Sequence, residues 1–112
     1  MGDGFMIAFG SARRALRCAS DIQRAIGADD DMNVKVRAGL HAGDVVREGD
    51  DFYGGVVNMA ARVAGCANGG EVLVSSIVRS LVETSGEFAF TEERVAELKG
   101  FAGPHRLHLL TV

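Results

Sequence analysis

The 112-residue sequence is poor in several residue types that mark particular protein classes. It has no tryptophan, one proline and two cysteines, and it contains no run of eighteen apolar residues that would span a membrane. Its net charge is −3 and it has no block of Lys or Arg, which argues against binding duplex nucleic acid through phosphates. The N-terminus lacks a basic region followed by a long apolar run, so we predict no signal peptide and a cytoplasmic location.

The cysteines and histidines show no catalytic or metal-ligating pattern. Cys18 and Cys66 lie among apolar residues without CxxC spacing, which predicts two buried free thiols, although the sequence alone leaves a disulfide open. His41, His105 and His108 lack metal-ligand spacing and are interpreted as structural or surface residues. The sequence also contains no Gly-x-Ser-x-Gly and no Walker A motif, which excludes the hydrolase elbow and the P-loop.

The composition and hydrophobic pattern of the sequence predict one ordered domain over residues 1–112. Hydrophobic residues make up 47% and charged residues 24% of the chain, as in soluble globular proteins. Ser11 is expected to cap the first helix, and glycines end several periodic segments. Hydrophobic periodicity predicts strands at 5–9, 34–40, 71–74, 88–90 and 107–110, a hairpin at 43–53, and helices at 12–26, 56–67 and 77–85. This alternation predicts an α/β sandwich with helices on one face of a sheet.

A few polar residues have positions suited to nucleotide or metal chemistry. Asp3 stands between two glycines before an apolar run, where a carboxylate suits Mg²⁺, although an ordinary turn residue fits as well. Asn58 and Arg62 are four residues apart on one expected helix face and can meet a ribose and a phosphate, or simply solvent. Asp51 near the hairpin end and Lys99 in a loop are equally compatible with solvated positions.

The order of these residues along the chain carries more information than any one of them. The segments in question are GDGFMIAF at 2–9, RAGLHAG at 37–43, DFYGGVVNMAAR at 51–62, GEVLVS at 70–75 and ELKGF at 97–101. Together they closely resemble the class III adenylate/guanylate cyclase catalytic domain over essentially the whole chain. The stretch Asp-x-x-Gly-x-x-Val-Asn-x-Ala-Ala-Arg at 51–62 is the most specific part.

The resemblance implies a fold and a reaction. The expected fold is α+β, a ferredoxin-like α/β sandwich of the nucleotide cyclase type. Such domains act as homodimers or heterodimers with another cyclase domain, and both subunits build the active site. Two divalent ions, Mg²⁺ or Mn²⁺, activate the ribose 3′-hydroxyl, which attacks the α-phosphate and releases pyrophosphate.

The family's functional residues map onto five positions of this sequence. Asp3 matches a metal-binding aspartate, and Asp51 matches the purine-selecting position, where a carboxylate accepts from the adenine amino group and favours ATP over GTP. Asn58 matches the residue that orients the ribose, and Arg62 the arginine that stabilises charge on the α-phosphate in the transition state. Lys99 matches the lysine that holds the terminal phosphates.

The sequence departs from the family at its beginning. It starts at the Gly-Asp-Gly turn, so it lacks the first strand with the other metal aspartate, the helices that follow, and the strand with a purine-reading lysine. We therefore expect a single partial cyclase domain with unpaired sheet edges and little turnover alone. Three interpretations remain: the back portion of a genuine adenylate cyclase, an inactive fragment that dimerises with or regulates a full-length cyclase, and a ferredoxin-like domain without a nucleotide role.

Overall fold

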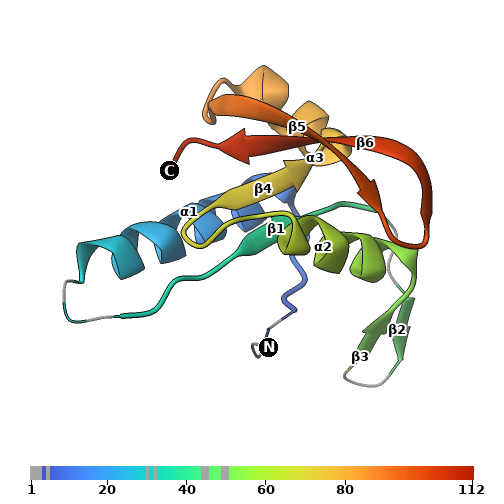
Figure 1. Cartoon of the computed structure of the whole chain (residues 1–112), viewed down its shortest axis with the longest axis horizontal. Helices are drawn as coiled ribbons and strands as arrows, with labels where there is room; N and C mark the ends of the chain where they lie inside the picture. The colour runs from blue at the N-terminus through green and yellow to red at the C-terminus, as the bar shows by residue number, and fades with distance from the viewer. Residues whose placement is uncertain (1–3, 5, 30, 32, 44–45, 49–50) are drawn as a thin grey trace.

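The computed structural model describes residues 4, 6–29, 31, 33–43, 46–48 and 51–112. Helices and strands alternate along this part of the chain (Figure 1). In chain order they are α1 (Ala12–Ala28), β1 (Ala38–Leu40), β2 (Val46–Glu48), β3 (Asp51–Tyr53), α2 (Gly55–Gly65), β4 (Val72–Ser75), α3 (Ser76–Val82), a 3₁₀ turn (Glu83–Ser85), β5 (Phe90–Leu98) and β6 (Phe101–Leu110). The expected α+β class is confirmed.

Four of the strands form one mixed sheet in the order β1-β4-β6-β5. β1 runs parallel to β4 with Gly39 opposite Leu73, whereas β6 is antiparallel to both of its neighbours. β2 and β3 form a separate antiparallel hairpin that pairs Val46 with Tyr53, which confirms the hairpin expected at 43–53. This hairpin leads directly into α2.

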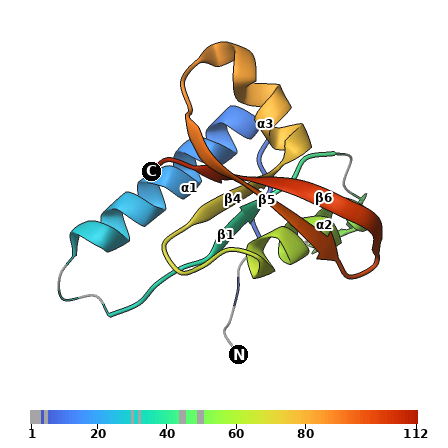
Figure 2. The same cartoon turned by 45° about the horizontal axis from the view of Figure 1, so that its top comes forward.

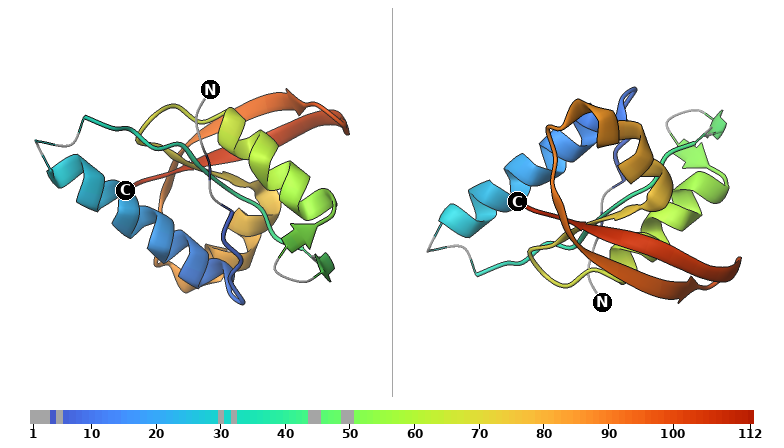
Figure 3. Two further views of the ribbon diagram at one scale, coloured as in Figure 1. Left: turned by 90° about the horizontal axis from the view of Figure 1, so that it is seen from below. Right: turned by 90° about the horizontal axis from the view of Figure 1, so that it is seen from above.

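Strand β4 is buried on both faces and so divides the core in two. Val72 and Val74 point to one face and Leu73 to the other. The first cluster joins α1 and α3 through Leu16, Val72, Val74, Val78, Val82 and Leu110. The second joins α2 through Met59, Val63, Ala67, Leu73, Leu98 and Leu107. The expectation that all helices cover one face is therefore wrong, and the strands run between α1 on one side and α2 on the other (Figure 3).

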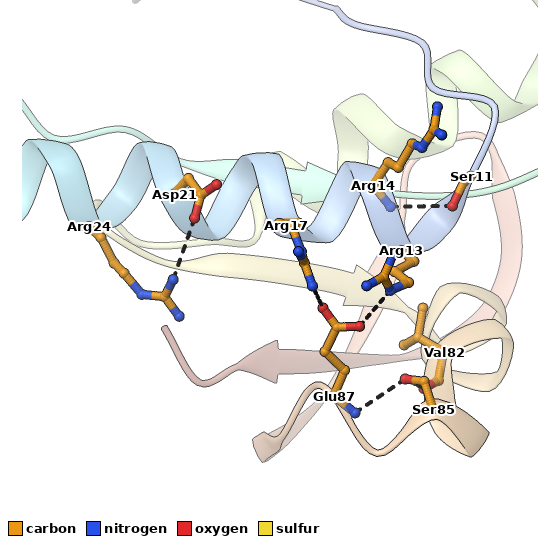
Figure 4. A network of polar contacts seen from close by, with 9 residues as sticks. All are labelled: Ser11, Arg13, Arg14, Arg17, Asp21, Arg24, Val82, Ser85 and Glu87. Atoms are coloured by element: carbon orange, nitrogen blue, oxygen red, sulfur yellow. Dashed lines mark hydrogen bonds and ion pairs between the residues drawn. The ribbon is translucent and has the colours of Figure 1, made fainter.

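Polar contacts at several points hold α1 against the rest of the domain. The Ser11 hydroxyl accepts a hydrogen bond from the backbone N–H of Arg14 at 3.3 Å, which confirms the expected N-cap. Arg13 and Arg17 both pair with Glu87, in the segment that follows the 3₁₀ turn (Figure 4). Gln23 of α1 donates from Nε2 to the carbonyl oxygens of Val36 and Glu71, at 2.8 and 3.0 Å. These two bonds fix α1 to the start of β1 and β4.

Two expected strands differ from the structure because pairing partners decide where strands form. Residues 6–9 are not a strand, and Met6, Ile7 and Phe9 are 46%, 60% and 41% exposed. The strand expected at 34–40 is reduced to Ala38–Leu40, the part that pairs with β4. Among the described residues β1 has a partner on one edge only, and apolar character without a neighbouring ladder does not make a strand.

The C-terminal hairpin is longer than the sequence indicates. The strands expected at 88–90 and 107–110 extend towards each other into β5 and β6 until only Lys99 and Gly100 separate them. Gly100 has φ +88°, a conformation that favours glycine and closes the tight turn. The hairpin reaches the side of the molecule where α2 lies (Figure 2).

Candidate functional site

Helix α2 has a tightly constrained position on the sheet. Gly54 enters it with φ +115°, and its carbonyl accepts the first helical hydrogen bond from the N–H of Asn58 at 3.2 Å. Met59 and Val63 of α2 are buried against the sheet. α2 also lies very close to β1 of the same sheet. A Cβ added to Gly39 would stand 2.2 Å from the backbone nitrogen of Ala64. Only glycine on β1 permits this approach.

Asn58 and Arg62 lie on the exposed side of α2, one helical turn apart. The buried side of the same helix is apolar, with Met59 and Val63 packed in the core. The structure therefore brings the expected polar pair onto one accessible face of a fixed helix. A carboxamide and a guanidinium in this arrangement can hydrogen-bond a ribose and a phosphate at the same time.

Lys99 occupies the two-residue turn between β5 and β6 rather than an irregular loop. The residue before it, Leu98, is buried and packs in the same cluster as Met59 and Val63. Packing of Leu98 thus joins this end of the hairpin to the core under α2, while the Lys99 side chain is exposed. A lysine there supplies a positive charge close to the helix that carries Arg62.

The structure gives a backbone position for only one of the two expected site carboxylates, Asp51 and Asp3. Asp51 is the first residue of β3 and pairs through its backbone with Glu48, three residues before Gly54 and α2. Asp3, the expected metal ligand, lies outside the described residues. The part of the chain that the structure describes contains no group of three or more His, Cys, Asp or Glu suited to hold a metal ion.

A partly exposed ion pair near the C-terminal end of α2 was not expected from the sequence. Glu71 at the start of β4 receives two hydrogen bonds of 2.8 Å from Arg94 of β5, and one of 2.7 Å from the N–H of Asn68. Arg94 also donates to the carbonyl of Cys66 just after α2, at 3.3 Å. The Arg94 guanidinium, followed by the Asn68 N–H, lowers the pKa of Glu71 to about 2. The network ties the segment that follows α2 to β5, and Glu71 and Arg94 lie 23 residues apart, too far to give a local sequence signal.

The histidine interpretation agrees with the structure, and the cysteine interpretation agrees in part. His41 Nδ1 and the Ser75 hydroxyl form a hydrogen bond of 2.8 Å, and His108 Nε2 lies 3.2 Å from the Ser76 hydroxyl. Burial is the main cause that lowers the pKa of His41, with a smaller contribution from the nearby His105. Both cysteines are free thiols, as expected, but the expected burial is wrong because both are only half-buried.

Comparison with known proteins identifies the family to which the chain belongs. The sequence model described as "Adenylate and Guanylate cyclase catalytic domain" matches residues 1–112, the whole chain. The chain belongs to the adenylate/guanylate cyclase catalytic domain family. Putative adenylate cyclase 3 of Rhizobium meliloti is 32% identical over 98% of this chain, which spans 19% of that protein.

Solved structures support the same assignment. The adenylate/guanylate cyclase/hydrolase from Silicibacter pomeroyi superimposes with a TM-score of 0.81 at 30% identity, covering 93% of this cyclase-family chain and 63% of that chain. The catalytic core of a rhodopsin-guanylyl cyclase with converted specificity, in complex with ATPαS, shares the fold with a TM-score of 0.77 at 24% identity, covering 94% and 60%. This chain thus spans less than two thirds of either structure. Within the described residues, no helix is both long and apolar enough to cross a bilayer.

Proposed function

We propose that this domain is an adenylate cyclase that converts ATP to cyclic AMP and pyrophosphate. The observation that carries the proposal is the pair Asn58 and Arg62, which are exposed one turn apart on α2, a helix packed closely against Gly39 of β1. The identity to a relative named as an adenylate cyclase supports the same activity. In this reaction the ribose O3′ forms a bond to the α-phosphorus while the bond to pyrophosphate breaks.

The proposed roles follow from what each side chain offers. Asn58 hydrogen-bonds the ribose and orients its 3′-hydroxyl towards the α-phosphate. Arg62 donates to the α-phosphate oxygens, where negative charge builds up in the transition state. Lys99, held beside α2 by the burial of Leu98, neutralises the terminal phosphates that leave as pyrophosphate.

Asp51 sets the choice of base in this proposal. A carboxylate accepts a hydrogen bond from the exocyclic amino group of adenine, whereas the guanine carbonyl at the same edge would be repelled. The position of Asp51 at the start of β3, directly before α2, is compatible with contact to a base whose ribose reaches Asn58. ATP is therefore the proposed substrate rather than GTP.

Divalent metal ions and a second cyclase domain complete the proposed site. Asp3 would supply one oxygen ligand to Mg²⁺ or Mn²⁺, and a hard divalent ion needs further oxygen ligands beyond one carboxylate. We infer that a homodimer, or a heterodimer with another cyclase domain, forms the working unit. The proposal predicts low activity for this chain alone and higher activity with a complete partner.

The test compares cyclic AMP and cyclic GMP formation by the 112-residue chain, alone and mixed with a complete cyclase catalytic domain that carries an inactivating substitution. The mixture is expected to form cyclic AMP from ATP, and Arg62→Ala is expected to reduce that rate about 10²- to 10³-fold. Arg24→Ala, at an exposed arginine of α1 on the other side of the sheet, is the matched control and should leave the rate unchanged.

Three results would separate the alternatives. An unchanged rate with Arg62→Ala would remove the catalytic role of Arg62, and faster turnover of GTP would remove the role of Asp51. If the chain raises the rate of a fully active partner but the Arg62→Ala and Arg24→Ala variants act equally, the chain is a regulatory partner rather than a contributor of catalytic groups.

A further inference from the structure

The guanidinium of Arg94 joins strand β5 to the segment that connects α2 with β4. Its Nη1 and Nη2 atoms each donate to a carboxylate oxygen of Glu71 at 2.8 Å. Nη1 also donates to the carbonyl of Cys66 at 3.3 Å, and Nε donates to Glu92 on the same strand. Every nitrogen of the guanidinium is therefore engaged. The planar fork of five N–H donors is what allows one side chain to make all of these contacts together.

The contact with Cys66 bonds Arg94 to the end of α2. Cys66 is the C-cap of this helix, and its own N–H donates to the carbonyl of Val63 at 3.0 Å. Carbonyls at the C-terminus of a helix lack intrahelical partners and carry partial negative charge, which favours a nearby cation. Arg94 supplies that cation from β5. Arg62 belongs to the same last turn of α2.

A directional contact at this end of α2 adds what apolar packing does not supply. Met59 and Val63 are buried in the core, and Gly54 provides no side-chain cap at the other end of the helix. Apolar contacts are not directional, so they restrain sliding and turning of a helix less than a hydrogen bond does. The bond from Arg94 to Cys66 therefore helps to set α2 along and about its own axis.

Arg62 depends on this setting because its side chain is exposed. Its position follows from the helical turn that carries it rather than from packing of the side chain itself. A guanidinium that stabilises a transition state must lie within hydrogen-bond distance of the reacting oxygens, and a displacement of about 1 Å caused far from the chemistry can cost about 10²-fold in rate.

We propose that Arg94 is a positioning residue, which holds the last turn of α2 where Arg62 can reach the α-phosphate. The inference rests on the proposed cyclase function. Glu71 assists by holding the guanidinium, and its carboxylate is charged at neutral pH because its pKa is about 2. Arg94 itself touches neither substrate nor metal in this role.

The test measures ATP turnover by the 112-residue chain mixed with a complete cyclase domain that carries an inactivating substitution. Arg94→Lys keeps the positive charge, but an ammonium cannot make the paired bonds to Glu71 together with the bond to Cys66. It should lower kcat at least about tenfold and leave the KM for ATP within about twofold, because Arg62 acts on charge that develops in the transition state.

A matched variant and a double variant separate positioning from a general loss of stability. Arg106→Lys makes the same change on the same hairpin, at an arginine that pairs with Glu93 instead, and should leave kcat unchanged. In an Arg62→Ala background, Arg94→Lys should change the rate by less than about twofold, since no Arg62 guanidinium is left to position. A loss of folded protein would lower the rate by the same factor with or without Arg62. That outcome, or full activity of Arg94→Lys, overturns the proposal.

Amide hydrogen exchange of the chain alone tests the contact without cyclase activity. The N–H groups of residues 63–67 should exchange at least about tenfold faster in Arg94→Lys than in the wild type, while those of α1 keep their rates. Unchanged exchange at residues 63–67 would also overturn the proposal. Should Arg94→Lys fail to fold, Glu71→Gln removes the charge that holds the guanidinium and replaces it in both measurements.

The outcome for the wild type distinguishes this inference from the proposed function. A wild-type mixture that forms no cyclic AMP would overturn the proposed function and the role of Arg94 with it. An active wild type with an equally active Arg94→Lys would overturn the role of Arg94 alone.

Discussion

Replacing Gly39 with alanine tests how firmly α2 is seated on β1. The new Cβ would lie 2.2 Å from the Ala64 nitrogen and 2.5 Å from its Cα, where ordinary van der Waals contact begins at 3.4 Å. The helix would have to move away by about 1.2 Å, the difference between 3.4 and 2.2 Å. Overpacking of a core costs about 1–3 kcal/mol, and we expect the upper end because backbone atoms cannot rotate aside.

Thermal unfolding followed by circular dichroism measures this cost. At about 4 °C per kcal/mol for a domain of this size, a loss of about 3 kcal/mol lowers Tm by about 12 °C. Gly65→Ala is the matched control, since it makes the same change on α2 at a position with no atom within 4 Å of the new Cβ. This control should be neutral or slightly stabilising because alanine favours the helix.

A double variant sharpens the test. Adding Ala64→Gly to Gly39→Ala removes the Cβ contact of 2.8 Å but leaves the two shorter backbone contacts. Stability should therefore not recover. If Gly39→Ala unfolds within about 1 °C of the wild type, or if Ala64→Gly restores it, the proposed backbone contact between β1 and α2 is incorrect.

Four further changes have defined expected outcomes in urea or thermal unfolding. Leu107→Ala empties a fully buried position (0% exposed) and should cost about 2–5 kcal/mol, and a loss below 1 kcal/mol would contradict its place in the core. Ser11→Ala removes the cap of α1 and should cost about 1 kcal/mol, which Ser11→Asp should largely restore. Glu71→Gln should cost about 2 kcal/mol at neutral pH. Because the folded pKa of Glu71 is depressed to about 2, its contribution is complete above the usual carboxylate pKa and is lost as pH falls towards 2, where variant and wild type should converge. Burial lowers the pKa of the His41 imidazole, so the unfolded chain takes up a proton first as the pH falls. Stability should therefore decrease as the pH drops below about 6.5. His41→Asn should reduce this slope between neutral pH and pH 5.5, and an unchanged slope would show that His41 does not cause it.

The sequence by itself determined the features that depend on neighbours within a few residues. The N-cap at Ser11, the hairpin before α2 and the shared face of Asn58 and Arg62 all follow from local spacing, and the structure has each of them. The family was also readable from the sequence, because the motif at 51–62 lies in one continuous segment. The roles of the five site residues remain proposals.

Tertiary structure alone decided what depends on partners far apart in the chain. Helices cover both faces of the sheet because β4 buries Val72 and Leu73 in opposite directions, and an apolar run shows that a strand is buried without showing which helix covers each side. Residues 6–9 have a strand-like composition but no pairing partner among the described residues. The bond between Glu71 and Arg94 joins residues 23 positions apart, and its energy depends on a distance that only the folded chain sets.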